Sequence, residues 1–185
     1  MGVELALNFA NKGAKVNLVL GPSSISVSHN NINVSNVESA KEMYSKATEL
    51  FADSTIFIAA AAVADYTPKV VSSQKIKKEE GTPIIELIKT KDILAEMGIK
   101  KTNQFIVGFA LETNNELENA KSKLKRKNLD LIVLNSLNDK GAGFQCDTNK
   151  ITILTKSNKK LSFELKSKHD VAEDIVSTIL IEIDA

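Results

Sequence analysis

The stretch Ile56-Phe57-Ile58-Ala59-Ala60-Ala61-Ala62-Val63 decides the fold class of this 185-residue chain. A nearly continuous apolar run of this kind is typical of a central parallel strand that is covered on both faces. Two similar runs occupy residues 105–111 and 129–135. Between them, residues 115–127 have the apolar spacing of a helix, with an inner face formed by Leu117, Ala120 and Leu124. The alternation predicts a parallel α/β sheet with right-handed crossovers.

The segments on either side extend this alternation. On the N-terminal side we predict a helix at 1–11 that stops at Gly13, strands at 15–21 and 32–37, and a helix at 39–51. On the C-terminal side we predict a β-hairpin within 150–166, with strands at 151–154 and 161–165, and a last helix at 168–183. The expected architecture is one α/β domain over 1–185, a Rossmann-like, three-layer, mostly parallel sheet with an appended β-hairpin.

The first elements come in the order helix, then strand, which is the second half of a βαβ unit. Its first strand would precede Met1, so we expect the first strand to be missing from this chain and the domain to be truncated at its N-terminus. Residues 70–90 interrupt the alternation because they are polar and lysine-rich, and they become strand-like at 84–88.

Composition excludes several classes of protein. The chain is 43% apolar and has no apolar run long enough to span a bilayer, which takes about 20 residues. The net charge of +1 argues against a dedicated duplex-DNA binder. Cys146 is the only cysteine, so an intramolecular disulfide is excluded and the cytoplasm is the expected compartment. Arg126 is the only arginine, so that anion binding would depend on lysines and backbone N–H groups.

The residues that follow strands are the candidates for a site, because ligands bind beyond the carboxyl ends of strands in open α/β sheets. Asp65 follows the deciding run, where it can hold a ribose hydroxyl, a metal or an amine, or simply begin a turn. Lys75 opens a Lys-Ile-Lys-Lys segment after a serine-rich stretch. That segment fits either a mobile flap over an anionic ligand or a solvated charged loop.

A basic helix end and a strand end offer two further candidates. Residues 121–127 hold five basic side chains, and the like charges of Lys123 and Lys127 lie at i, i+4. A bound polyphosphate would offset their repulsion, although cations also complement a helix C-terminus. Gly108 permits close backbone approach, and Phe109 fits either a stacked nucleobase or the core. The basic segment has no interleaved aromatic side chain, which argues against single-stranded nucleic acid.

Four segments occur together in one order and spacing: Ala61-Ala62-Val63-Ala64-Asp65-Tyr66, Lys75-Ile76-Lys77-Lys78, Gly108-Phe109-Ala110-Leu111-Glu112-Thr113 and Lys127-Asn128-Leu129-Asp130-Leu131-Ile132. In this combination the chain resembles the phosphopantothenoylcysteine synthetase domain of bacterial bifunctional coenzyme A biosynthesis proteins, the DNA/pantothenate metabolism flavoproteins. The resemblance covers essentially the whole chain, including the segment 141–149, the final hairpin and the last helix.

The resemblance implies a ligase that activates 4′-phosphopantothenate with CTP to an acyl-cytidylate, releases pyrophosphate, and then joins cysteine with release of CMP. Mg²⁺ would accompany CTP. The implied catalytic residue is Lys75, whose ammonium would stabilise developing negative charge. The nucleotide contacts that the resemblance implies are Ala61, Ala62, Asp65, Lys75, Lys91, Asp92, Ile93, Leu94, Phe109, Lys123 and Lys127.

The resemblance also implies partners. It implies a homodimer, for which the hairpin at 150–166 is one candidate element. It makes a fused flavin-dependent phosphopantothenoylcysteine decarboxylase domain plausible, and FMN would belong only to such a domain. The family's strand, phosphate-binding turn and substrate-holding asparagine would precede a segment like Met1-Gly2 and are not present here, which puts the activity of this chain alone in doubt.

Two alternatives come from other classes. A nicotinamide-dependent reductase would often carry a Tyr-x-x-x-Lys motif, but Thr48 and Val70 follow the two tyrosines, Tyr44 and Tyr66, at that spacing. A non-catalytic anion-binding module would need only the charge of the flap lysines. A zinc site is not expected, because the two histidines lie far apart in unrelated surroundings.

Overall fold

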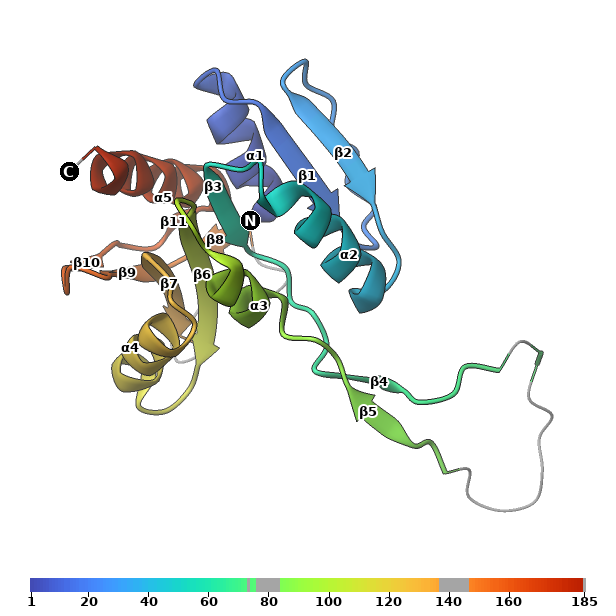
Figure 1. The fold of residues 1–185 in the computed structure, drawn as a ribbon. Helices are drawn as coiled ribbons and strands as arrows, with labels where there is room; N and C mark the ends of the chain where they lie inside the picture. Colours follow the sequence, from blue (N-terminus) through green and yellow to red (C-terminus); the bar gives the residue numbers. More distant parts are fainter. Residues whose placement is uncertain (73, 76–83, 137–146, 185) are drawn as a thin grey trace.

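The computed structural model describes residues 1–72, 74–75, 84–136 and 147–184. The helices of this part are α1 (Gly2–Asn11), α2 (Ala40–Phe51), α3 (Ile93–Lys100), α4 (Glu116–Arg126) and α5 (Lys168–Ile183). Its strands are β1 (Val16–Leu20), β2 (Ile32–Asn36), β3 (Ile56–Ala59), β4 (Tyr66–Pro68), β5 (Leu87–Lys89), β6 (Phe105–Glu112), β7 (Leu131–Ser136), β8 (Thr148–Asn149), β9 (Ile151–Thr155), β10 (Lys160–Ser162) and β11 (Lys166–Ser167). Figure 1 shows their arrangement.

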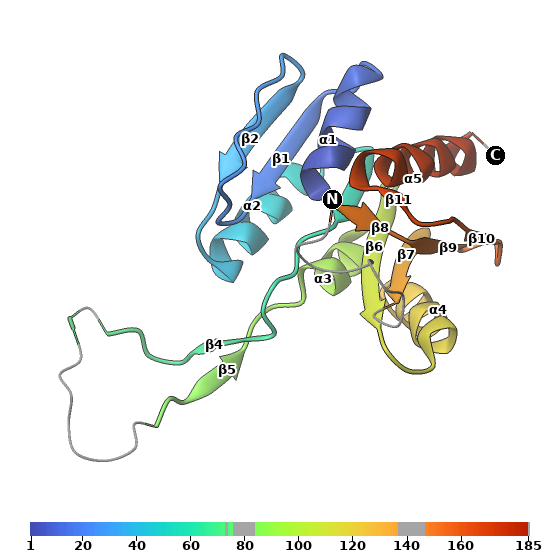
Figure 2. The same ribbon diagram turned by 180° about the vertical axis from the view of Figure 1, so that it is seen from behind.

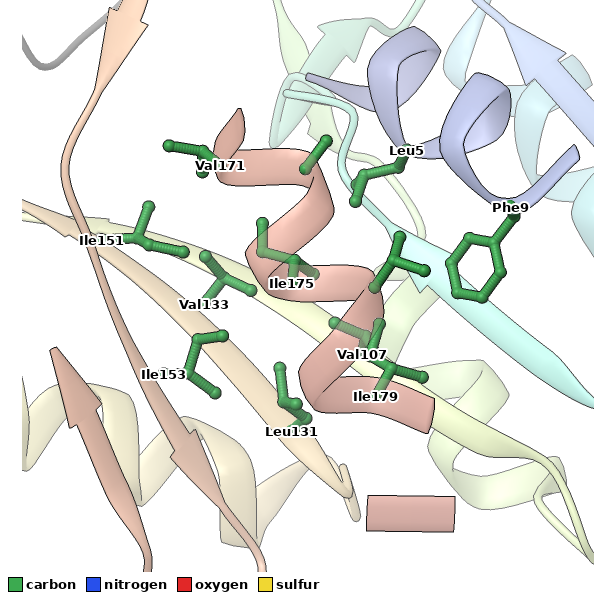
Figure 3. Close-up of a cluster of buried hydrophobic side chains, with 12 residues drawn as sticks. Leu5, Phe9, Val107, Leu131, Val133, Ile151, Ile153, Val171, Ile175 and Ile179 are labelled. Carbon is green, nitrogen blue, oxygen red and sulfur yellow. The ribbon is translucent and has the colours of Figure 1, made fainter. Parts of the chain in front are cut away.

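The main sheet has five strands in the order β10-β9-β7-β6-β3. β3, β6 and β7 are parallel, whereas β9 and β10 continue the sheet antiparallel and form the expected hairpin. Successive residues of a strand point to opposite faces, so Leu131 and Val133 pack against α5 and α1, while Ile132 and Leu134 pack toward α3 and α4. Figure 3 shows the cluster on the α5 side. The predicted three-layer α/β architecture is confirmed.

A second, smaller sheet lies beside the main one. β1 and β2 pair in parallel, with Val16 opposite Ile32 and Leu20 opposite Asn36. α1, which precedes them, packs on α5 through Leu5. Gly13 ends the α1 turn with a φ of 91°, as its position predicted. Among the described residues no ladder joins β1 to β3.

Several local predictions need correction. β3 ends at Ala59, so that only the first half of the deciding run is a strand, and β3 forms the edge of the five-stranded sheet in the described part of the chain. Beyond Ala59 the chain leaves the sheet toward β4. Leu117 was expected to face inward but is 37% exposed, because it lies in the first turn of α4, before Ala120 meets the sheet. α3 and β4 were not predicted at all.

The most conspicuous feature in both views is an arm formed by β4, β5 and their flanking segments, which projects away from the two sheets (Figures 1 and 2). The strands pair antiparallel, with Thr67 opposite Ile88. At the base of the arm, the Thr90 N–H donates to the Asp65 carbonyl at 2.9 Å, and the Thr90 hydroxyl donates to the Ala64 carbonyl at 2.6 Å. The arm therefore leaves from and returns to one point of the body.

In the described ranges, no helix combines the length and the apolar character needed to cross a membrane. Ile76–Lys78 of the flap motif, Cys146 and most of the segment 141–149 lie outside the described residues.

Candidate functional site

Two of the predicted site residues form an ion pair at the start of α3. Asp92 is the N-cap of this helix, where its Oδ1 accepts a hydrogen bond from the Ala95 N–H at 3.0 Å. Lys127, at the C-cap of α4, brings its Nζ to within 2.6 Å of Asp92 Oδ2. Partial burial acts to raise the pKa of the Asp92 carboxyl, but the hydrogen bonds from Lys127 and Ala95 outweigh burial and hold it below its usual value.

Lys123 lies one turn before Lys127 and reaches the main sheet. Its Nζ donates to the Phe109 carbonyl of β6 at 2.9 Å. Burial, followed by the like charge of Lys127, lowers the pKa of the Lys123 ammonium. α4 therefore directs two ammonium groups to the surface between α3 and β6. The N–H groups of a helix N-terminus lie beside them, which is the arrangement that binds anionic oxygens.

Lys91 is positioned by a residue that the sequence did not single out. Its Nζ lies 4.4 Å from the centroid of the Tyr44 ring of α2, and Lys100 Nζ lies 5.9 Å from the same centroid. Such cation–π contacts contribute about 0.5–1 kcal/mol at exposed sites. In the sequence, Tyr44 counted only as a tyrosine that has no lysine four residues later. Nothing local could have revealed its cationic partners, because both come from segments that are distant in the sequence.

Ala61, Ala62 and Asp65 lie on the exposed segment between β3 and the arm. Thr90 binds the backbone of this segment and directly precedes Lys91 in the chain. The fold thereby brings the start of the arm next to the start of α3, so that residues from both sequence regions share one end of the molecule.

Lys75 is the predicted site residue that the described structure does not bring to the others. It belongs to the arm, is exposed, and makes no hydrogen bond or ion pair with the described residues. The arm that carries it extends away from α3 and α4 in both views (Figures 1 and 2). Its approach to Lys123 and Lys127 would require a movement of the arm.

Leu94 and Gly108 contribute to packing. Leu94 is buried in the cluster between the sheet and α3, and Ile93 packs against that cluster. A Cβ on Gly108 would lie 2.8 Å from methyl carbons of both Leu94 and Leu129. The close approach predicted at Gly108 is therefore made by two core leucines. The side chain of Phe109 packs against the α5-side cluster, while its carbonyl receives Lys123.

Within the described residues, no group of three or more His, Cys, Asp or Glu side chains could hold a metal ion. The carboxylates that act on the two lysines are Asp92, which is already engaged by Lys127, and Glu112, whose charge acts on Lys123. A Mg²⁺ ion that accompanies a nucleotide is commonly held chiefly by the phosphates and needs few protein ligands.

Comparison with known proteins identifies the domain. A family model described as the DNA/pantothenate metabolism flavoprotein C-terminal domain matches residues 1–182. The chain belongs to this family. A relative from an unknown prokaryotic organism, named cysteine/cysteine sulfinic acid decarboxylase, is 55% identical over 97% of this chain and 50% of its own length. The coenzyme A biosynthesis bifunctional proteins CoaBC of Haemophilus influenzae and Bacillus subtilis are 44% and 42% identical, each over 97% of this chain and 44% of their own length.

A solved structure supports the same assignment. The crystal structure of the C-terminal domain of a coenzyme A biosynthesis bifunctional protein CoaBC has a TM-score of 0.82 and 32% identity, and the match covers 98% of this chain and 81% of that one. The family resemblance and the fold class predicted from the sequence are thus confirmed. The chain spans about half the length of the curated relatives it matches.

Proposed function

We propose that this domain catalyses the CTP-dependent ligation of cysteine to 4′-phosphopantothenate in coenzyme A biosynthesis. The observation that carries the proposal is the convergence of Lys127 and Lys123 beside the N-terminus of α3, in a chain whose family includes CoaBC proteins. The segment from Ala61 to Asp65 and the residues Lys91 to Leu94 border this point, and Phe109 supplies the carbonyl that holds Lys123.

The lysines would bind the triphosphate as point charges, since the chain has only one arginine to offer a planar fork. Lys127 would exchange its Asp92 partner for a phosphate oxygen, and Lys123, which donates to a neutral carbonyl, would gain an anionic partner for an ammonium that burial makes costly. Mg²⁺ would accompany CTP and supply charge neutralisation. Asp65, which is exposed where the chain leaves β3 for the arm, would offer a carboxylate to this ion.

The chemistry divides between the body and the arm. The body would bind and orient CTP so that the carboxylate of 4′-phosphopantothenate attacks the α-phosphorus and pyrophosphate leaves. Lys75 would be carried in by the arm, and its ammonium would stabilise the negative charge that develops as the acyl-cytidylate forms and as the cysteine amine displaces CMP. Closure of the arm would also exclude water from the activated acid.

Isothermal titration of the chain with CTP, with and without Mg²⁺, and with NADPH tests the binding step. We expect heat of binding for Mg²⁺–CTP and none for NADPH. Binding of NADPH without CTP would instead favour a nicotinamide-dependent reductase. CTP binding in a full-length version that forms no phosphopantothenoylcysteine from its three substrates would favour a non-catalytic anion-binding module.

The arm is a better candidate for a homodimer interface than the hairpin at 150–166. The arm exposes a row of large apolar side chains, namely Tyr66, Val70, Val71, Ile84, Ile85, Leu87 and Ile88. An isolated two-stranded ribbon has marginal stability in water, so these side chains need a covering surface. In the hairpin only Leu161 of β10 and Leu165 are large exposed apolar side chains, at 38% and 46%, and Lys159 and Lys160 directly precede Leu161, which discourages edge pairing.

The edge of β5 is suited to a second copy of the chain. The Lys69 N–H donates to the Glu86 carbonyl, so Lys69 and Glu86 form a hydrogen-bonded pair of the ladder. The backbone polar groups of the next pair, Pro68 and Leu87, therefore point away from the partner strand, toward the free edges of β4 and β5. Proline has no N–H, so it blocks the β4 edge, whereas the β5 edge keeps its outward N–H and C=O groups. Two identical β5 edges can pair antiparallel about a twofold axis, which is a self-complementary interface.

The remaining partners concern the longer relatives. We propose that a flavin-dependent decarboxylase domain carries FMN in the fused protein, which agrees with the family's description as flavoproteins and with the decarboxylase name of the 55% identical relative. We also propose that a strand preceding α1 in that longer chain lies between β1 and β3, whose facing edges have no partner among the described residues. The expected compartment of such an enzyme is the cytoplasm.

A further inference from the structure

The strongest unexplained feature outside the contacts already described is a set of interactions that joins the C-terminal ends of α3 and α4. Gly98, in α3, is buried so tightly that an added Cβ would lie 2.0 Å from the Lys127 carbonyl oxygen. The obstacle is backbone, so a side chain at position 98 cannot be accommodated by a rotamer change. The two helices would have to separate.

Asn128 completes the contact from the other side. Its backbone lies in the left-handed region with a φ of 53°, which ends α4 immediately after Lys127. Its side-chain Nδ2 donates to the Gly98 carbonyl at 3.0 Å. A left-handed asparagine therefore both turns the chain and fastens the turn to α3.

A mostly buried ion pair supports this turn. Lys101, at the end of α3, contacts Asp130, and the two side chains are only 11% and 17% exposed. Asp130 also accepts a hydrogen bond from the Ile106 N–H of β6 at 2.8 Å. The end of α4 is thereby fixed to both α3 and the sheet.

Lys127 is consequently held by α3 at two points. Its carbonyl lies against Gly98, and its ammonium contacts Asp92. Asp92 precedes Gly98 by six residues, which corresponds to about 9 Å along the axis of α3. We propose that Gly98 and Asn128 are positioning residues, which fix the backbone of Lys127 so that its ammonium reaches the nucleotide site. This proposal rests on the proposed function of Lys127 but concerns residues that would not touch the nucleotide.

Asn128→Gly is the informative variant, because glycine tolerates the left-handed backbone and only the hydrogen bond to Gly98 is lost. Asn158→Gly is its matched control, since Asn158 is also left-handed (φ 64°) but lies in the β9–β10 turn. We expect Asn128→Gly to weaken Mg²⁺–CTP binding about fivefold, the equivalent of one hydrogen bond. The control should leave CTP affinity unchanged. Gly98→Ala, which forces α3 and α4 apart, should weaken Mg²⁺–CTP binding more than Asn128→Gly does.

Two readouts separate positioning from a general loss of stability. In a Lys127→Met background, Asn128→Gly should have no additional effect on CTP affinity, because its effect acts through Lys127. Without any nucleotide, NMR titration of the Asp92 carboxyl should show a pKa that rises toward the ordinary value in Asn128→Gly, because the ion pair with Lys127 loosens. The Asn158→Gly protein should keep the depressed pKa.

The outcomes distinguish this inference from the proposed function. If a full-length version binds no CTP, the proposed function is wrong, while the Asp92 titration still reports whether Asn128 positions Lys127. If CTP binds but the Asp92 pKa is the same in wild type and Asn128→Gly, the inference is overturned. It is equally overturned if the affinity loss of Asn128→Gly persists in full when Lys127 is replaced by methionine.

Discussion

The two regions that carry the proposed site lysines differ in how the fold holds them. At the α3–α4 contact, Lys123 and Lys127 are partly buried and each has a partner, the Phe109 carbonyl and the Asp92 carboxylate. On the arm, Lys75 has no partner among the described residues and its surroundings are exposed apolar side chains. The contrast separates two lysines that the fold already holds in place from one lysine whose position depends on what the arm contacts.

The difference has a physical reason. A lysine that binds substrate in every state of the cycle gains from rigidity, because ordering costs are already met before binding. A lysine that acts only in the transition state can come from a mobile element that closes over bound substrate. This division between lysines that are held before binding and a lysine that is brought in later predicts different effects for variants of the two regions.

Lys75→Ala should lower the ligation rate of a full-length version by at least about 100-fold, the scale of losing one charge-stabilising group in a transition state. CTP affinity, measured by titration, should change little. Lys69→Ala, on the same arm, removes only an exposed ion pair with Glu86 and should leave the rate near wild type. Equal losses of rate and CTP affinity in Lys75→Ala would make Lys75 a uniform binding contact and would break the division.

Lys127→Met should weaken CTP binding about 10- to 100-fold, because a charge-assisted hydrogen bond contributes roughly 1.5–3 kcal/mol. Lys125→Met is the matched control, since Lys125 is exposed on the same helix. Titration calorimetry at constant ionic strength measures both. If the two variants lose the same affinity, the lysines of α4 act only through general positive charge, and the site is not preorganised.

Leu87→Lys should raise the dimer dissociation constant by at least about tenfold, because a symmetric interface loses the buried leucine twice. Leu161→Lys, in the hairpin, is the comparison. Sedimentation equilibrium measures the dissociation constant of each variant. Dissociation by Leu161→Lys with an intact Leu87→Lys dimer would restore the hairpin predicted from the sequence and would leave the arm's apolar row without a partner.

The smallest expected effect is on pH dependence. Burial and the charge of Lys127 lower the pKa of Lys123, so that its folded-state value lies below the unfolded value of 10.5. The folded chain then binds fewer protons than the unfolded chain between the two values, and stability rises with pH through that window. In the opposite sense, CTP affinity should begin to fall at a lower pH than an ordinary lysine would give. NMR titration of the Lys123 side chain should show its pKa rising when CTP binds; a pKa that CTP leaves unchanged would remove Lys123 from the site.

Much of the fold followed from local patterns. The apolar runs and helical spacings predicted α1, α2, α4 and α5 to within about two residues, and the hairpin from its alternation. α3 was missed because its helix is short and follows an irregular segment. Half of the deciding run was not a strand, because β3 loses its partner where Ala59 meets Gly108 and the chain departs for the arm.

The candidate site, like the fold, could be predicted from the sequence only in part. The resemblance to the family was sufficient to propose Lys75, Asp92, Lys123 and Lys127 as site residues, and Lys75 and Lys127 lie in its motifs. The sequence could not show that Asp92 pairs with Lys127, that Tyr44 lies beside Lys91, or that Gly108 accommodates core leucines. These contacts join residues that are far apart along the chain.

By itself, the sequence determined the α/β class, the family and the scarcity of arginine, because periodicity, motif order and composition are local properties. Only the tertiary structure showed that Lys123 and Lys127 have partners and that Lys75 has none among the described residues. Partner, burial and exposure depend on packing between α3, α4 and β6, and on the absence of such packing around the arm in the described residues. Packing couples distant segments, and no local pattern records which segments will meet.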